Sequence, residues 1–237
     1  MKAAIISDIH ANLEALKAVL KSIEQYDVDA VYCLGDTVGY GPNPNECIEL
    51  VREKCLYVLL GNHDHAAIDK TKLEYFNPYA RAAVFWTREH LTPKNKEYLA
   101  SLPYTHQNDE MLMVHASPSN PAHWYYIQKP YEAQIEMQSF SQSLCFIGHS
   151  HMPVIFSESD VFRGPFYNFE AGKKYIVNVG SVGQPRDGNH KACYALYDLR
   201  AKSLSYIRLE YEVQQTYSKI LKAGLPPFLA ERLLKGY

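Results

Sequence analysis

Aspartate, histidine and asparagine residues recur at the ends of short apolar segments, where their side chains could bind metal ions. Asp8 and His10 follow the first such segment, and Asp36 follows the second. Three later segments lead into the other members of this set: Asn62, His115, His149 and His151. Imidazole and carboxylate ligands together suit Mn, Fe, Zn or Ni, and the set is larger than the four ligands of a structural zinc site. We therefore predict two neighbouring divalent ions that share one carboxylate.

The apolar segments themselves have the length and composition of strands that are buried on both faces. They cover residues 3–7, 30–35, 56–61, 111–114, 144–148 and 175–179. In open α/β sheets, ligands bind beyond the carboxyl ends of such strands. Because residues i and i+2 of an extended chain point to the same side, we expect Asp8 with His10, and His149 with His151, to converge.

Helical segments alternate with these strands in the first half of the chain, which predicts a mostly parallel sheet. The apolar side chains of residues 12–23 share one helical face, and Asn43-Pro44 begins a second helix. We take residues 1–237 as one domain. We expect a helical insertion over the site at about 66–110, and a hairpin followed by a helical tail at about 192–237.

Composition limits the classes of partner. The chain has 237 residues with 24 Lys and Arg, 26 Asp and Glu, and a net charge of -2. Binding to nucleic acid or to an anionic membrane would require an excess of basic residues, so neither partner is expected. No apolar stretch is long enough to span a bilayer, and no charged leader precedes one. Five cysteines without a Cys-x-x-Cys motif fit a reducing compartment, so we expect a cytoplasmic protein.

The residue after Asn62 is a candidate general acid. In an extended segment the ring of His63 would point away from the metal that Asn62 binds, which suits protonation of a leaving oxygen. Asp64 could accept the other ring proton and fix the tautomer. Paired metals clamp the attacking and leaving oxygens of an in-line displacement and supply a metal-activated hydroxide as nucleophile. A bridging hydroxide and an anionic phosphate would balance the charge that two aspartates leave unneutralised.

Three further residues are candidates for substrate binding. Arg186 follows a glycine-containing turn, where it either binds a phosphate bidentately or lies free at the surface. His65 either contacts substrate or is a solvated loop residue. Tyr40 and the aromatic run at 123–126 either stack on a nucleobase or pack a lid onto the domain.

These motifs resemble the five motifs of the calcineurin-like metallophosphoesterases, in the family's order: Asp8-x-His10, Gly35-Asp36, Gly61-Asn62-His63-Asp64, His115 and Gly148-His149-x-His151. The resemblance implies an α/β/α sandwich of two packed mixed β-sheets flanked by helices. It also implies a dinuclear centre in which Asp36 bridges and His63 is catalytic. One ion would be held by Asp8, His10 and His151, and the other by Asn62, His115 and His149. We expect manganese first, ahead of iron, zinc, nickel or magnesium.

Residues 178–187 resemble the small bacterial and archaeal branch of this family, which includes phosphodiesterases and dinucleoside-tetraphosphate hydrolases. Protein serine/threonine phosphatases of the superfamily carry Asp-Arg-Gly after the bridging Asp and Glu after the catalytic His. Here the first stretch is Thr37-Val38-Gly39-Tyr40-Gly41 and the second residue is Asp64, which disfavours a phosphoprotein substrate.

We therefore predict a hydrolase of phosphate esters or phosphoanhydrides of small molecules, with nucleotides and dinucleoside polyphosphates as leading substrates. Two alternatives stay open, a nuclease and a non-catalytic metal-binding scaffold. The lack of a basic excess argues against the first, and the complete ligand set argues against the second. The C-terminal tail either covers a sheet edge or docks onto a second chain, which leaves an oligomer open.

Overall fold

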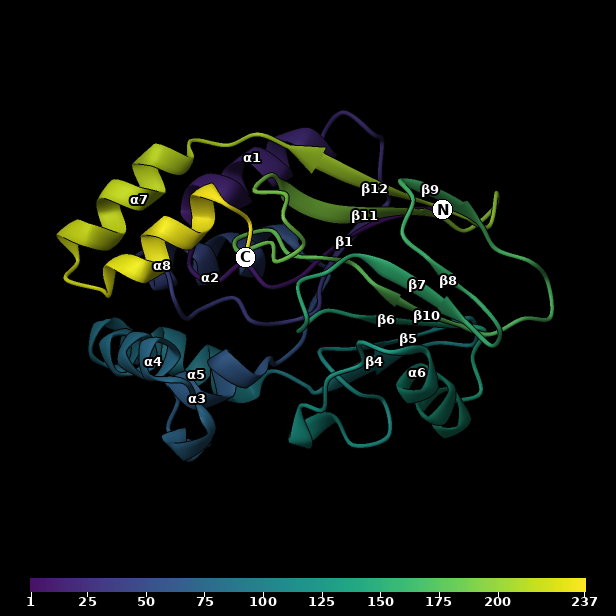
Figure 1. Cartoon of the computed structure of the whole chain (residues 1–237), viewed down its shortest axis with the longest axis horizontal. Coiled ribbons are helices and arrows are strands. Elements are labelled where there is room, and N and C mark those ends of the chain that lie inside the picture. The colour runs from purple at the N-terminus through teal and green to yellow at the C-terminus, as the bar shows by residue number, and fades with distance from the viewer.

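Two six-stranded β-sheets pack against each other in the computed structural model, which describes residues 1–237 apart from the side chain of Tyr75 (Figure 1). The first sheet has the order β3 (Tyr57–Val58), β2 (Ala30–Cys33), β1 (Lys2–Ile6), β11 (Ala192–Asp198), β12 (Ser203–Leu209) and β9 (Phe166–Asn168). The second has the order β4 (Thr105–Gln107), β5 (Met111–Val114), β6 (Leu144–Ile147), β10 (Tyr175–Asn178), β7 (Val154–Ser157) and β8 (Val161–Phe162).

All six predicted strands are present, and they divide equally between the sheets. β1, β2 and β3 are parallel in the first sheet, and β5, β6 and β10 are parallel in the second. The other pairings are antiparallel, including the predicted hairpin of β11 and β12. The sandwich of two mixed sheets is thus confirmed, whereas a single mostly parallel sheet is not. β3 ends at Val58, short of the predicted range, because only two of its residues pair with β2.

The main core lies between the two sheets. Ile5 of β1 is packed in one cluster with Phe146 of β6 and with Tyr175 and Val177 of β10, and all four are fully or almost fully buried. This apolar layer joins the sheets and brings the carboxyl ends of their parallel strands to one side of the sandwich.

Helices cover the outer faces of both sheets. α1 (Leu13–Ile23) and α2 (Pro44–Lys54) contribute to the apolar layer on the first sheet, and α6 (Pro130–Glu136) to that on the second. The Asn12 side chain caps α1 by accepting a hydrogen bond from the Ala15 amide. α4 (Pro78–His90) and α5 (Pro93–Ser101) lie within the range predicted for the helical insertion, whereas α3 (Asn62–Ala67) begins before it.

The C-terminal tail consists of α7 (Val213–Lys222), α8 (Pro227–Glu231) and the 3-10 turn η4 (Arg232–Leu234). Figure 1 places α7 and α8 at the end of the molecule where α4 lies. Ile220, Leu229 and Leu233 are buried in a cluster with Ala80 of α4 and with Tyr40. The tail therefore packs on α4 and on the loop after β2, and not along a sheet edge. Within the described part of the chain, no helix combines the length and apolar character needed to cross a bilayer.

Candidate metal centre

The predicted metal ligands converge where the parallel strands of both sheets end. Their ligand atoms form three overlapping groups, in each of which the atoms lie within 4.8 Å of one another. The groups are Asp8, His10 and His151; His10, Asp36 and His63; and Asp36, His115 and His149. His10 and Asp36 each belong to two groups, so the three groups form one continuous cluster.

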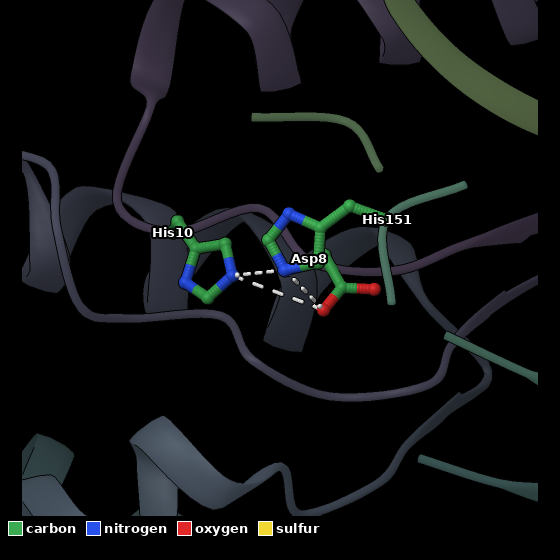
Figure 2. A group of neighbouring side chains, drawn as sticks. All are labelled: Asp8, His10 and His151. Atoms are coloured by element: carbon green, nitrogen blue, oxygen red, sulfur yellow. Dashed lines mark hydrogen bonds and ion pairs between the residues drawn. The ribbon is translucent and has the colours of Figure 1, made fainter. Parts of the chain in front are cut away.

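Figure 2 shows the first group, in which two imidazoles and one carboxylate face a common point. The Nε2 atom of His151 lies 3.2 Å from Oδ1 of Asp8 and 3.1 Å from Nε2 of His10. The Nε2 atom of His10 lies 3.8 Å from the same Asp8 oxygen. These three atoms are the kinds of donor that a divalent transition metal prefers.

Asp36 connects the group of Asp8, His10 and His151 to the group that contains His115 and His149. Its Oδ2 atom lies 3.7 Å from Nε2 of His10 and 3.3 Å from Nε2 of His115. The Nε2 atom of His115 is also 3.2 Å from Oδ1 of Asn62, so the amide belongs to this group. One carboxylate oxygen of Asp36 therefore faces imidazoles of both groups.

Main-chain oxygens fix the orientation of three of these imidazoles. In each, Nδ1 donates to a carbonyl group, so the lone pair of Nε2 is directed into the site. The pairs are His10 with Val38 at 3.2 Å, His115 with Leu34 at 3.1 Å, and His151 with Gln184 at 2.6 Å.

Main-chain amides orient the two carboxylates in the same way. The His149 amide donates to Oδ2 of Asp8 at 3.0 Å, and the His63 amide donates to Oδ1 of Asp36 at 2.8 Å. The other oxygen of each carboxylate is left to face the imidazoles. This approach requires glycine at position 61, because a Cβ there would lie 2.1 Å from Oδ1 of Asp36.

The backbone at the ligands corrects one expectation. Five of them have φ values between 52° and 66°, in the left-handed region: Asp8, His10, Asp36, His149 and His151. They converge through tight left-handed turns and not through an extended chain. Such a conformation costs a non-glycine residue on the order of 1–3 kcal/mol, so it persists only where the surrounding structure holds it, commonly at functional sites.

Buried atoms without partners show that these residues fit a metal. Oδ1 of Asp8 and Nε2 of His149 are buried, and the described residues offer neither a hydrogen bond. Burial lowers the pKa of His149 to about 3, so its ring is neutral and able to ligate. Burial acts in the same direction on His115, but the negative charges of Asp36, Asp8 and Asp64 together outweigh it and raise the pKa of His115 to about 9. A divalent cation at Asp36 would take the place of this proton.

The ring of His63 lies on the pocket side of the ligands. α3 begins at Asn62, so His63 is helical and not extended as expected. Its ring centroid is 4.9 Å from that of His10 and 4.4 Å from that of Tyr40, and Nδ1 is buried without a hydrogen-bond partner among the described residues. Burial lowers its pKa to about 4.

Asp64 has a different set of partners from the one expected. Its carboxylate accepts three main-chain N–H groups, from Thr37 at 3.2 Å, Val38 at 3.0 Å and Gly61 at 3.1 Å. No hydrogen bond between Asp64 and the His63 ring is present in the described structure. Burial and the nearby Asp36 charge raise the pKa of Asp64 to about 7, against the effect of the three amides. Asp64 therefore ties the loop that carries Asp36 to the start of α3.

A pocket of about 310 Å³ opens beside the centre. Asn62, His63 and His149 reach it from the candidate centre, and Tyr40 lines it from the loop after β2. The described lining does not include His65, whose Nδ1 lies 2.5 Å from the Thr71 hydroxyl and whose ring faces that of Trp124 at 5.9 Å.

The aromatic run at 123–126 supplies another wall of this pocket. The ring of Tyr126 stacks on His149 with centroids 4.0 Å apart, and that of Trp124 meets His115 edge-on at 5.9 Å. Tyr126 and Trp124 also line the pocket. The two functions considered for residues 123–126, a packed lid and a stacking surface for a planar group, are therefore compatible.

Asn178 is a residue whose role the sequence did not reveal. Its amide nitrogen donates to the Gly148 carbonyl at 2.5 Å and to the Ser150 hydroxyl at 2.9 Å, and its oxygen accepts from the Gly180 amide at 3.0 Å. It thus holds the turn that carries His149 and His151. Asn178 is the last residue of β10, so its position at the end of a strand could have identified it as a residue of the site.

We expect Asn178→Ala to weaken manganese binding by roughly 10- to 100-fold, as loss of a group that orients ligands usually does. Calorimetric titration of manganese into the chelated protein measures this. The control is Asn168→Ala, which removes an exposed asparagine of β9. Equal affinity in the wild type and Asn178→Ala would show that the turn does not need this support.

Comparisons with known proteins agree on the family. Residues 1–202 match the calcineurin-like phosphoesterase superfamily domain. An uncharacterized protein of Methanocaldococcus jannaschii is 41% identical over 98% of this chain and 97% of its own. The crystal structure of a metallophosphoesterase from Sphaerobacter thermophilus superposes with a TM-score of 0.89 and 40% identity, over 100% of this chain and 99% of that one. A hypothetical protein from Pyrococcus horikoshii OT3 shares the fold, with a TM-score of 0.84 and 24% identity over 100% and 98% of the two chains.

Proposed function

The chain belongs to the calcineurin-like phosphoesterase superfamily and is a phosphoester hydrolase, and from this premise we propose that it cleaves phosphate esters or phosphoanhydrides of small molecules with two divalent ions bound. The observation that carries the proposal is the position of Asp36, whose Oδ2 atom faces ligands of both groups. A site for paired ions is suited to in-line displacement at phosphorus, because the attacking and leaving oxygens both need positive charge nearby.

In this proposal Asp8, His10 and His151 would hold one ion, and Asn62, His115 and His149 would hold the other. Asp36 would contribute its carboxylate to both, and manganese is the metal expected first. When bound, the ions would supply Lewis acidity that lowers the pKa of water and neutralises charge on phosphoryl oxygens.

The chain's own residues position the substrate and move a proton. His63 lines the pocket next to Asn62, so its ring is within reach of a leaving oxygen on a phosphate bound there. An anionic phosphate beside the ring favours its protonated form, which offsets the effect of burial. Asp64 acts through the main chain, by keeping His63 and Asp36 in register.

The pocket favours a substrate with a planar group. Trp124 and Tyr126 offer ring faces or edges at its wall, and Phe76 closes part of the lining. Base–aromatic stacking contributes about 1–3 kcal/mol per base, enough to select nucleotides over simple sugar phosphates. We therefore propose nucleotides or dinucleoside polyphosphates as the substrate class.

We expect Trp124→Ala to weaken competitive inhibition by adenosine 5′-monophosphate about tenfold, because a stacking surface is lost. Inhibition by ribose 5-phosphate, which lacks the base, should not change. The control is Tyr131→Ala, which removes an exposed aromatic side chain from α6. Equal weakening of both inhibitors would contradict a base-binding role for Trp124.

A substrate panel tests the proposed reaction. The chelated protein, re-supplied with manganese, is given an activated monoester, an activated diester, cyclic nucleotides, diadenosine tetraphosphate and single-stranded DNA. Selective cleavage of a small phosphate compound supports the proposal, and preferential digestion of the DNA would favour the nuclease. If none of these compounds is hydrolysed although two ions are bound, the result would favour the non-catalytic scaffold.

A further inference from the structure

Two arginine side chains converge on Tyr40 at the edge of the pocket. The guanidinium carbon of Arg186 lies 5.7 Å from the centroid of the Tyr40 ring, and that of Arg232 lies 5.8 Å from the same centroid. Tyr40 in turn lines the pocket and packs against the rings of His10 and His63, at 4.7 Å and 4.4 Å. One tyrosine ring thus links both cations to the candidate centre.

Arg186 approaches from the turn after β10. Its Nη2 atom donates to Oε1 of Gln184 at 2.8 Å and lies 3.5 Å from the Tyr40 hydroxyl. Its charge also reaches the facing wall, because burial raises the pKa of Tyr126 and Arg186 offsets part of that rise. Arg186 therefore lies beside the Tyr40 hydroxyl, and its positive charge acts on the wall of the pocket that Tyr126 forms.

Arg232 approaches from the C-terminal tail, beyond the residues that match the family domain. The apolar packing of Leu229 and Leu233 fixes the turn that carries it, and its Nε donates to the main-chain oxygen of Tyr237 at 2.5 Å. Burial and the charge of Arg186 lower the pKa of Arg232 to about 10. The positive charges of the two arginines therefore repel each other, in agreement with the position of both beside the Tyr40 ring.

Neither arginine has an acidic side chain as a partner. Among the residues that the structure describes, no Asp or Glu carboxylate forms an ion pair with Arg186 or Arg232. Two like charges beside one ring repel each other, and an anion bound between them would relieve that repulsion. Guanidinium groups match the oxygens of phosphate in both charge and geometry.

We propose that Arg186 and Arg232 together bind a second phosphate of the substrate, next to the one that is cleaved. The proposal rests on the proposed function and deepens it, because it makes Arg232 a specificity-determining residue and the tail a part of the binding site. The substrate class then narrows to compounds with at least two linked phosphates, such as a nucleoside diphosphate or a longer polyphosphate ester.

The test compares the affinities of adenosine 5′-diphosphate and adenosine 5′-monophosphate, which differ only in the second phosphate. Calorimetry measures both with the manganese-loaded protein in a fixed excess of manganese. The wild type should prefer the diphosphate. Arg232→Gln and Arg186→Gln should each reduce that preference about tenfold, the loss typical of one hydrogen bond to a charged group, with little change for the monophosphate. Arg232→Lys should retain part of the preference, because it keeps the charge without the planar fork.

The control is Lys222→Gln, which removes an exposed positive charge from α7 of the same tail and should leave the preference intact. Thermal unfolding shows whether each variant keeps its tail folded, and Arg186→Gln tests the site even if Arg232→Gln loosens the tail. A wild type that does not distinguish the two nucleotides, or variants that lose both equally, would overturn the proposal. Calorimetry measures binding and not hydrolysis. If no compound of the substrate panel is hydrolysed, that result would therefore count against the proposed function and not against the phosphate site.

Discussion

Asp36→Asn should abolish metal-dependent hydrolysis while leaving the fold intact. The substitution keeps the shape of the side chain but removes the negative charge that both ligand groups share. Changes to groups that merely orient ligands cost 10- to 100-fold, so loss of the shared ligand should lower turnover by more than about 100-fold. Turnover of an activated diester, together with the number of ions bound per chain by elemental mass spectrometry, checks both parts of this result.

The matched control for this variant is Asp109→Asn, which makes the same change on an exposed loop. It should keep wild-type turnover and wild-type metal content. If Asp36→Asn also kept both, Asp36 would not be a ligand and the proposal of a shared carboxylate would fail.

His63→Ala should lose turnover and keep its metals. The ring lies in the pocket next to the ligands, and the described structure shows no hydrogen bond that would make its nitrogens structural. Positioned general acids contribute about 100- to 10,000-fold, and the contribution grows as the leaving group becomes a poorer one. We therefore expect a larger loss for an alkyl ester than for a p-nitrophenyl ester, measured as kcat for each with metal content determined in parallel.

His90→Ala serves as the control for His63, because it removes an exposed histidine from α4. Full activity of His63→Ala against an activated phosphodiester would exclude the role given to this residue. A loss of bound metal that accompanies the loss of turnover would instead make His63 a ligand, as its place in the group with His10 and Asp36 also permits.

The strand pattern was sufficient to predict where the site lies. The apolar segments before Asp8, Asp36, His115 and His149 are all strands, and their carboxyl ends meet at one side of the sandwich. Short buried strands have a strong local signature, and the rule that ligands bind at their carboxyl ends does not depend on the details of the loops. The second sheet and its antiparallel strands followed from the family resemblance and not from the alternation of elements.

The backbone of the ligand turns could not be predicted in the same way. Left-handed φ values are rare for residues other than glycine, and those of Asp8 and His10 accompany main-chain hydrogen bonds to Gly35 and Asp36, which are distant in the sequence. The sequence correctly predicted that these ligands converge, but it predicted an extended chain where the structure has left-handed turns. The same applies to Asp64, whose carboxylate is occupied by amides from a loop more than twenty residues away.

The role of the tail depends entirely on tertiary packing. A helical tail was predicted, but nothing local to residues 213–237 indicates that Leu229 and Leu233 pack next to Tyr40. Arg232 therefore could not be recognised as a neighbour of Arg186 before the fold was known. Long-range pairs of this kind are where local sequence patterns lose their predictive value.

The most direct test of the central claim is a titration of the chelated protein with manganese, followed by turnover of an activated diester at each step. The proposal of two ions around Asp36 predicts no turnover without metal and recovery that is complete after two equivalents per chain. Undiminished turnover by the chelated, metal-free protein would contradict metal dependence. Full recovery after one equivalent, with no second ion bound, would contradict the paired site.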